Sequence, residues 1–483
     1  MQLNNKMALV PLDSRPCNLK FPVKLAAAAG FDVIVPPTEL LDYFKKPADT
    51  AGIIDWIKEI SGACSGLIVS SDMLSYGGLI ASRSSKTSLE EARNNLSCLM
   101  QIRKDNPKIK IFALSIITRL SITAGSEKEA EIWQRLFKSA ALAKEAEDLF
   151  RPGEGLPREV IEEFISVRKR NHEINRACIE LTGSGVIDYL VLGKEDSAPE
   201  GLQVREVVLL EDQISSLCLK EKVLITNGAD ELSCVLTARQ VSERSKDRPK
   251  IAVRYSAKNE KATAMYEDSS VADNVAQHIS AAGAVMTEKI SDSDIVLFID
   301  LFDDKQKDLL FEAPKLKEGE RLHLLKNFCS EIVMVKDLGK KAAVADINYC
   351  NGADAQFLET LGSVFRLDLL DAYAGWNTAS NSIGCAVAQA VLPENKPFLL
   401  ERFVDDLGYQ AVVRPQINKY LEETGISKYD LGPQKKDIEM IAKQKMADWS
   451  KEFLSKLEIG NWKLDIALPW PRTFEADCDI ILQ

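Results

Sequence analysis

The stretch Val223-Leu224-Ile225-Thr226-Asn227-Gly228-Ala229-Asp230-Glu231 contains the repeating unit from which the fold can be argued. Four residues of β-rich sequence lead into a glycine-containing turn, and Leu232 then opens a helical pattern. We therefore expect a buried strand, then a loop with two adjacent carboxylates, then a helix. In parallel α/β folds the loops that follow the strands form the rim on which ligands bind.

The adjacent residues Asp230 and Glu231 allow two interpretations. Side-by-side carboxylates at such a rim suit acid–base chemistry, because partial burial and the charge of one raise the pKa of the other. The same two residues also suit the start of a helix, with Asp230 as its cap and Glu231 as a first-turn acid that complements the helix dipole. We carry both the catalytic and the capping interpretation forward.

The strand-then-helix pattern repeats along the first half of the chain. Six short apolar runs show little alternation, which is typical of strands buried on both faces of a parallel sheet. They are residues 7–12, 32–36, 67–71, 109–115, 187–192 and 223–226. Helical patterns lie between them, one of them opened by the capping box of Ser88 and Glu91. This alternation predicts an α/β protein.

The second half resumes the pattern in the manner of a Rossmann-type layer, with apolar runs at 251–255, 284–287, 295–300, 342–347 and 369–374. We favour a TIM-like barrel that contains the first six strands and is completed from the second half, because the six consecutive units show no visible reversal of order. The alternative is a pair of open parallel sheets that face each other. The predicted regions are a barrel-like part (1–245), a Rossmann-like part (246–392) and a mainly helical appendage on the outside (393–483).

Composition excludes several classes of protein. The chain has 483 residues, of which 46% are hydrophobic and 28% charged, as in soluble globular proteins, and it has no apolar run of membrane-spanning length. The net charge of -11, with basic residues interspersed among acids, makes nucleic acid an unexpected partner. The 10 Cys lack Cys-x-x-Cys spacing, and residues 1–11 do not form a signal peptide, so we expect reduced thiols and a cytoplasmic protein.

No cofactor is expected. Neither a Gly-x-Gly-x-x-Gly sequence after the first strand nor a phosphate-binding loop motif is found, so nucleotide binding lacks its usual cradle. The 3 His, at 172, 278 and 323, lie in helical stretches away from the strand ends, which disfavours a histidine-based zinc site or a Ser-His-Asp triad. A magnesium site built from Asp13, Asp72, Asp196 and Asp346 is the metal-dependent alternative.

Nearly every predicted strand ends in polar residues of the kind that bind ligands. Because the carboxyl ends of parallel strands meet at one rim, we predict that these residues bind a small-molecule or oligosaccharide substrate there. The set comprises Asp13, Arg15, Asp72, Tyr76, Arg83, Arg119, Glu195, Asp196, Tyr255, Asp346, Asn348, Trp376 and Asn377. The three arginines should share one pocket and hold Asp13, Asp72 and Asp196 ionised.

Several of these clusters form motifs. They are PLDSRPCN at 11–18, SDMLSYGGL at 71–79, EDSAPEG at 195–201, GADE at 228–231 and AGWNTA at 374–379. The motifs resemble those of a bacterial family designated domain of unknown function 4127, and the likeness spans almost the whole chain. The family implies no activity. Its pattern has Asp-Asp where this chain has Glu195 and Asp196, which leaves the role of the first position open.

The Gly-Ala-Asp-Glu sequence also resembles the Gly-Gly-Asp-Glu motif of chitobiase-type β-N-acetylhexosaminidases, which are TIM barrels. That resemblance implies that Asp230 orients the substrate's acetamido group while Glu231 protonates the leaving oxygen, and no enzyme nucleophile is then needed. Aromatic faces for the sugar would come from Tyr76, Tyr255 and Trp376. The leading hypothesis is a retaining, substrate-assisted glycosidase for 2-acetamido sugars. The alternatives are a metal-assisted hydrolase or transferase and a two-lobed binding protein.

Overall fold

The computed structural model describes residues 5–150, 155–245 and 248–483. The chain divides into two compact units. The first contains the residues up to Leu236 together with Tyr266–Asp268, and the second contains Thr237–Met265 and Ser269–Gln483. Each unit has helices and a parallel sheet, which confirms the α/β class.

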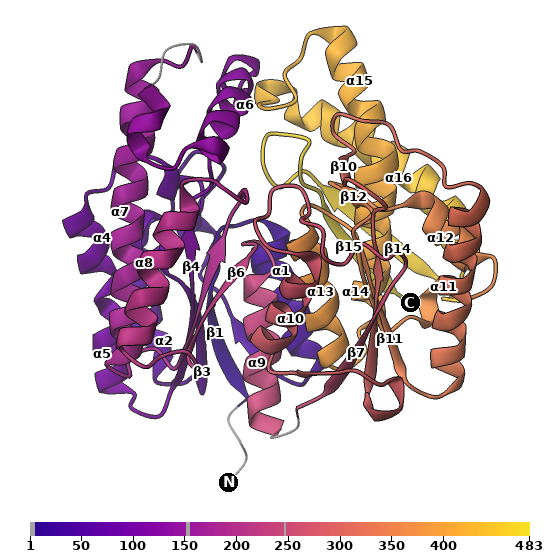
Figure 1. Ribbon diagram of the computed structural model, residues 1–483, viewed down its shortest axis with the longest axis horizontal. Helices are drawn as coiled ribbons and strands as arrows, with labels where there is room; N and C mark the ends of the chain where they lie inside the picture. Colours follow the sequence, from indigo (N-terminus) through magenta and orange to yellow (C-terminus); the bar gives the residue numbers. More distant parts are fainter. Residues whose placement is uncertain (1–4, 151–154, 246–247) are drawn as a thin grey trace. The chain divides into compact units, whose positions relative to one another are not determined.

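The first unit is built on a six-stranded parallel sheet with the strand order β2-β1-β3-β4-β5-β6 (Figure 1). Its strands are β1 Lys6–Val10, β2 Asp32–Ile34, β3 Gly66–Ser70, β4 Lys110–Ile117, β5 Tyr189–Lys194 and β6 Val223–Asn227. All six overlap the apolar runs recognised in the sequence. The register is continuous across the middle of the sheet, where Ala8 is opposite Leu67 and Val69 is opposite Ala113.

Helices connect these strands. They are α1 Pro16–Ala28, α2 Thr50–Ser61, α3 Ser71–Tyr76, α4 Leu89–Leu96, α5 Cys98–Asp105, α6 Glu127–Leu142, α7 Arg158–Gly183, α8 Gln203–Ser216 and α9 Leu232–Ser245. Short 3-10 turns lie at Thr38–Leu40, Ala81–Arg83 and Ala146–Phe150. The expected cap of α4 is present, since Ser88 Oγ accepts the Glu91 N–H at 3.1 Å.

Alternate residues of each central strand face two different cores, as continuous apolar strands require. In β3, Leu67 and Val69 join the core that lies under α2, α4, α5, α7 and α8. Ile68 faces the other core, which contains Leu232 of α9 and is contacted by Val23 of α1. Helices therefore cover both faces of this sheet.

The second unit repeats the same arrangement with a five-stranded parallel sheet in the order β13-β11-β9-β7-β8. Its strands are β7 Lys250–Tyr255, β8 Val285–Thr287, β9 Ile295–Asp300, β11 Lys341–Asp346 and β13 Ala372–Ala374. Numbered along the chain within each unit, the first five strands of both sheets follow the order 2-1-3-4-5, which is that of flavodoxin-like doubly wound proteins. The predicted Rossmann-like character of this part agrees with that order.

The remaining elements of the second unit complete its core. They are α10 Val271–Ala281, β10 Lys307–Asp308, α11 Gly319–Asp337, β12 Tyr349–Cys350, α12 Ala355–Gly362, α13 Ala379–Val391, α14 Lys396–Arg402, a π-helix Phe403–Val413, α15 Arg414–Thr424, α16 Lys435–Leu454, β14 Trp462–Ala467 and β15 Asp477–Leu482. Short 3-10 turns lie at Ile290–Asp292, Leu367–Leu369 and Gly432–Gln434. Residues of 393–483, among them Phe403, Met446 and Ile480, share one hydrophobic core with Phe298 and Val344 of the sheet.

Both sheets are open and parallel, as in the alternative, and neither forms the favoured barrel. The first sheet ends at β2 on one side and at β6 on the other. A barrel needs each successive strand to add on the same side, but β2 pairs with one edge of β1 and β3 pairs with the other. That reversal depends on which edge of β1 each strand meets, which the run of strands and helices along the sequence does not show.

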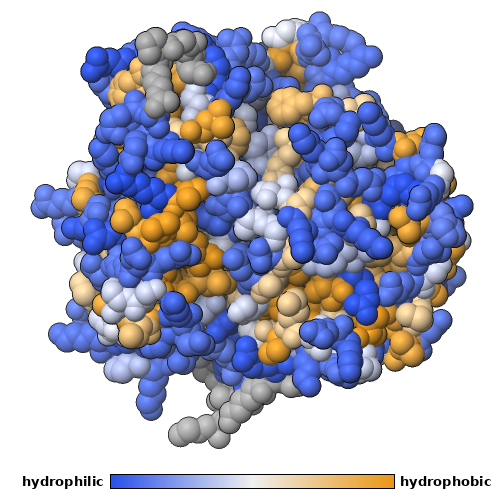
Figure 2. Space-filling view, in the orientation of Figure 1, coloured by the Kyte–Doolittle hydropathy of each residue, from blue (hydrophilic) through white to orange (hydrophobic). Residues whose placement is uncertain are grey.

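Hydrophilic side chains cover most of the visible face of the protein (Figure 2). The hydrophobic colour gathers over α8, where Val204, Val208 and Leu209 are exposed. Nine of the ten cysteines are buried, and Cys218 is exposed. Among the described helices none is both long enough and apolar enough to cross a membrane.

A glycine on β5 sets how closely the β6–α9 turn approaches the sheet. A Cβ at Gly193 would overlap the carbonyl oxygen of Gly228 and lie 2.6 Å from Leu232 Cδ1. We therefore expect Gly193→Ala to lower the free energy of unfolding by about 3 kcal/mol in urea denaturation, because backbone must move to admit the methyl group. Gly62→Ala is the control, since its Cβ would meet only Asn106 Oδ1 at 3.5 Å. Equal stability of the two variants would contradict this account.

Candidate functional site

The strand order of the first unit creates a switch point between β1 and β3. Because β2 and β3 flank β1, the connection from β1 to β2 and the connection from β3 to β4 run in opposite directions across the sheet. In open α/β sheets, ligands bind in the crevice outside the carboxyl ends of the strands at such a point. Asp13 and Arg15 follow β1 there and Asp72 follows β3, and all three were predicted site residues.

Arg15 joins two carboxylates that lie far apart in the sequence. Its Nε and Nη2 donate to Asp13 Oδ2 at 2.9 and 2.7 Å, and its Nη1 and Nη2 donate to the two oxygens of Asp230 at 2.9 and 2.5 Å. Asn18 Nδ2 also donates to Asp13 Oδ1 at 3.0 Å and to Asp230 Oδ1 at 3.3 Å. All four side chains are buried. The planar guanidinium therefore fixes the orientation of both carboxylates.

One guanidinium, that of Arg15, pairs with two carboxyl groups, so the acids of this cluster outnumber its cation. Burial raises the pKa of Asp230 to about 6, although the charge of Arg15 opposes the rise. A further carboxyl group, Asp42, accepts the Ser14 N–H at 2.7 Å, and burial together with the charge of Asp13 raises its pKa well above the usual range. Its Oδ2 is buried without a hydrogen-bond partner among the described residues. Asp42 was not predicted, because it follows a short turn and carries no strand-end signal.

Asp72 lies just after β3, and its surroundings strongly raise its pKa. The ladder between β3 and β4 ends with Ser70 opposite Leu114, and Asp72 Oδ2 then accepts the Ile116 N–H at 3.0 Å. Burial raises the pKa of Asp72 to about 7, and the charge of Glu195 adds to the rise. At neutral pH this residue can therefore both donate and accept a proton.

Glu195 and Asp196, which follow β5, form ion pairs with the other two predicted arginines. Arg83 forms an ion pair with Glu195 through Nη2 and donates from Nη1 to Thr123 Oγ1 at 2.6 Å. Arg119 pairs with Asp196 and lies 3.9 Å from Glu195 Oε1. The charge of Glu195 raises the pKa of Asp230 as well as that of Asp72, so these groups lie within electrostatic reach of one another.

The prediction for the arginines is thus correct in one respect and wrong in another. Arg15 and Arg119 do hold Asp13 and Asp196 in ion pairs. No cation among the described residues pairs with Asp72, and burial favours its protonated form. The strand-end pattern could not show this difference, because it does not reveal which side chain reaches an arginine.

Two more predicted residues lie beside this cluster in the first unit. Tyr76 is buried on α3, under the guanidinium of Arg170 at 4.3 Å from the ring centre, and burial raises its pKa. Glu231 is fully buried, and its Oε2 accepts the Ala229 N–H at 3.2 Å. The Glu231 carboxylate thus folds back onto the turn that carries Asp230.

A buried ion pair after β5 was missed by the sequence analysis. Lys194 pairs with Asp268, whose Oδ2 also accepts from Gln203 Nε2 at 3.2 Å. The chain returns to the first unit for Tyr266–Asp268, and the Tyr266 carbonyl accepts the Ser197 N–H at 2.8 Å. Lys194 and Asp268 are 74 positions apart, and no local pattern connects them.

The other predicted site residues belong to the second unit, where they lie at or just after the carboxyl ends of β7, β11 and β13. They are Tyr255, Asp346, Asn348, Trp376 and Asn377. Burial raises the pKa of Tyr255 to about 12. Trp376 packs on Phe474 with ring centres 5.9 Å apart, and the Asn377 carbonyl accepts the Asn351 N–H at 2.9 Å.

A lysine occupies the centre of the polar group in the second unit. Lys317 Nζ lies 2.7 Å from Asp354 Oδ2 and 3.3 Å from Asp300 Oδ2. Asn348 Nδ2 donates to Asp354 at 3.0 Å, while Asp346 Oδ2 accepts from Tyr373 OH at 3.0 Å. Burial raises the pKa of Asp346 well above the usual range. Lys317 was not predicted, because it precedes α11 and does not follow a strand.

In the part of the chain that the structure describes, no three His, Cys, Asp or Glu side chains are arranged to hold a metal ion. Asp13, Asp72 and Asp196, from the magnesium alternative, are bound instead to Arg15, the Ile116 N–H and Arg119. That alternative therefore gains no support from the geometry.

These features define an α/β protein of doubly wound open sheets with a buried carboxylate and guanidinium site at the carboxyl edge of the first sheet. The chain belongs to the family described as protein of unknown function (DUF4127), which matches residues 7–479 and confirms the resemblance seen in the motifs. No curated protein matches the sequence.

The raised pKa of Asp72 predicts a measurable effect on stability. Between the ordinary pKa of 3.8 and the folded value of about 7, the folded protein keeps a proton that the unfolded chain releases, so stability falls as pH rises through this window. Asp72→Asn lacks this penalty and should be more stable than the parent at pH 8, by up to about 4 kcal/mol, but not at pH 4. Asp55→Asn, at an exposed position on α2, is the control. A pH-independent effect of Asp72→Asn would refute the assignment.

Proposed function

We propose that the protein is a glycoside hydrolase that acts on 2-acetamido sugars by acid–base catalysis at the switch point of the first unit. The observation that carries the proposal is the contrast between two carboxyl groups. Asp72 is buried without a cation and has a pKa of about 7, while Asp230 is gripped by both terminal nitrogens of Arg15. Carboxyls with different environments are what acid and charge-stabilising roles require.

In the proposed mechanism Asp72 is the general acid and Asp230 stabilises positive charge. Asp72 donates its proton to the leaving oxygen as the glycosidic carbon–oxygen bond breaks, and the acetamido oxygen of the substrate bonds to the anomeric carbon. Asp230 is opposite the charge that develops on the acetamido group. Water then opens this ring, and the Asp72 carboxylate takes the proton of that water, which restores the starting acid.

This assignment moves the acid from Glu231, its place in the sequence-based hypothesis, to Asp72. Glu231 Oε2 accepts the Ala229 N–H of its own turn, whereas burial raises the pKa of Asp72 to about 7, which suits a proton donor near neutral pH. Asp72 lies at the switch point itself. Asp230 keeps the role proposed for it from the sequence.

The proposal also includes a class of substrate and a cellular location. Oligosaccharides or small glycosides are the proposed substrates, since the rim offers forked donors and ionised acceptors for hydroxyl groups. A cytoplasmic location is supported by the ten cysteines, none of which forms a disulfide bond among the described residues, as suits a reducing compartment.

The two pKa values predict the pH dependence of turnover. Activity needs Asp230 ionised, above about 6, and Asp72 protonated, below about 7. We therefore expect a narrow bell-shaped profile of kcat/KM with its maximum between about pH 6 and about pH 7. The profile should be measured with alkyl N-acetylhexosaminides, whose poor leaving groups need a proton from the acid. A plateau that extends above pH 8 would exclude Asp72 as the acid.

The roles of the three carboxyls can be separated by leaving-group acidity. Asp72→Asn should lower kcat on the order of 10²- to 10⁴-fold for poor leaving groups and much less for p-nitrophenol, which needs no proton. Asp230→Asn should lower it for all leaving groups alike, because the charge on the acetamido group forms whatever departs. Glu231→Gln is the comparison that tests the earlier hypothesis.

Under the proposed mechanism Glu231→Gln keeps the parent's dependence on the leaving group. If Glu231→Gln is the only variant that loses activity selectively on poor leaving groups, Glu231 is the acid. If the parent binds 2-acetamido sugars in calorimetry but cleaves none of the glycosides, the protein is a binding protein and the hydrolase proposal is wrong.

A further inference from the structure

A cavity of about 590 Å³ lies in the first unit. Its walls come from the turn at Ala81–Arg83, from the loop between β4 and α6, and from α7. The volume falls within the range of roughly 300–1,000 Å³ that is usual for small-molecule sites. Tyr76 lines it from α3, the helix that also carries Asp72. A ligand in this cavity therefore lies next to the element that holds the acid.

The charges that line the cavity are mainly positive. The cations are Lys45, Arg83, Lys86 and Lys128, and the carboxylates are Glu129 and Glu163. The lining thus has an excess of two positive charges, although the whole chain has a net charge of -11. A lining of that sign in an acidic protein favours anionic ligands.

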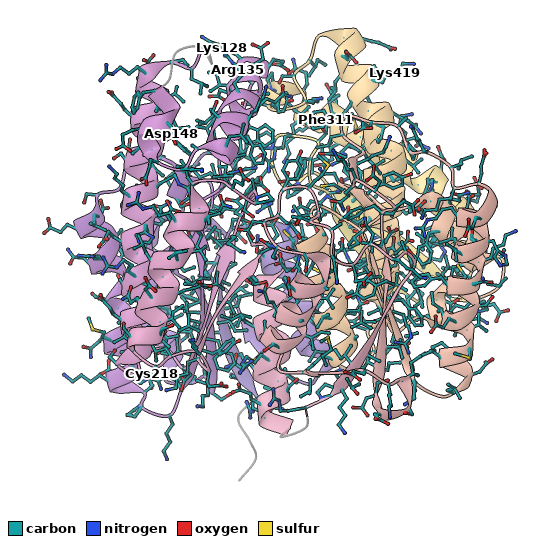
Figure 3. The ribbon with its side chains drawn as sticks, in the orientation of Figure 1. Lys128, Arg135, Asp148, Cys218, Phe311 and Lys419 are labelled. Atoms are coloured by element: carbon teal, nitrogen blue, oxygen red, sulfur yellow. The ribbon has the colours of Figure 1, made fainter. Side chains whose placement is uncertain are left out.

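Both carboxylates of the lining already have partners. Glu129 pairs with Lys45 at 2.9 Å and accepts the Gly125 N–H at 2.7 Å, and Glu163 accepts from Ser85 Oγ at 2.8 Å. Lys86 and Lys128, by contrast, are exposed and have no acidic partner among the described residues. Figure 3 shows Lys128 at the end of the unit opposite Cys218, which is the end where the six strands have their carboxyl ends.

Arg83 connects the cavity with the carboxylate cluster. Its side chain is 8% exposed, and it pairs with Glu195 and donates to Thr123, another residue of the lining. Its Nε is buried without a hydrogen-bond partner in the described part of the chain. A buried guanidinium N–H that lacks an acceptor costs free energy, and a ligand oxygen would satisfy it.

We infer that this cavity binds an anionic substituent, a carboxylate or a phosphate, carried by the sugar on which the neighbouring carboxyls act. The choice of sugar rests on the proposed function, whereas the charge preference rests on the cavity alone. Arg83 contacts the anion from the inner wall, and Lys86 and Lys128 contact it from the mouth. The protein therefore selects acidic over neutral 2-acetamido sugars.

The test is calorimetric binding to the full chain at low salt, where such contacts are least screened. The probes are N-acetylglucosamine, N-acetylglucosamine 6-phosphate, N-acetylmuramic acid and inorganic phosphate. The phosphorylated sugar, the sugar acid or both should bind at least about tenfold more tightly than the neutral sugar, and this preference should fall as salt rises. The two acidic sugars distinguish a phosphate site from a carboxylate site.

The double variant Lys86→Gln/Lys128→Gln should remove at least about tenfold of the affinity for the acidic sugar and leave that for the neutral sugar unchanged. Lys104→Gln/Lys138→Gln is the matched control, since it removes the same charge from exposed positions on α5 and α6 outside the cavity lining. The inference is wrong if the control weakens binding equally, or if no acidic probe, inorganic phosphate included, binds more tightly than the neutral sugar. Acidic sugars that bind but are not cleaved as glycosides would refute the hydrolase proposal alone.

Discussion

The first unit depends on the ion pairs of Arg15. Three strands separate β1 from β6, so the sheet alone would keep their ends about 19 Å apart. The loops and the first turns of α1 and α9 bridge that span, and Arg15 locks them together by binding Asp13 and Asp230 at once. Removing one partner of a buried ion pair typically costs about 3–5 kcal/mol, because the remaining charge stays desolvated. The rim of the sheet therefore keeps its shape only while this guanidinium is in place.

The two units use the same strand order but fill their switch points differently. In the second unit, Lys317 lies between Asp300 and Asp354, and Arg321 donates to the carbonyls of Ser256 and Leu301. Lys317 of that unit thus pairs with Asp300 and Asp354, whereas burial raises the pKa of Asp346, which has no ion pair among the described residues. In the first unit, Asp72 has no such cation among the described residues, and Tyr76 of the same helix lines a cavity. The pKa of about 7 at Asp72 and the cavity lined by its helix favour the first unit as the place where a ligand is bound.

The sequence predicted the local features well and the long-range ones poorly. Every apolar run of the first half became a strand, and the polar residues after each strand lie at its carboxyl end, since both follow from local composition. The open sheet in place of a barrel was not predicted, because the order of strands depends on which edge each strand meets. The pair of Lys194 and Asp268 was missed for the same reason, because only the fold brings its members together.

The proposed function moves the general acid from Glu231 to Asp72, because proximity along the chain does not ensure proximity at the site. Glu231 is next to Asp230 in sequence, but its carboxylate binds the Ala229 N–H. Asp72 is 158 positions away from Asp230, yet both feel the charge of Glu195. Burying Asp72 beside a negative charge destabilises the folded protein at neutral pH. A protein of ordinary marginal stability keeps such a residue where its proton is useful, and that argues for Asp72 as the reactive acid of the first unit.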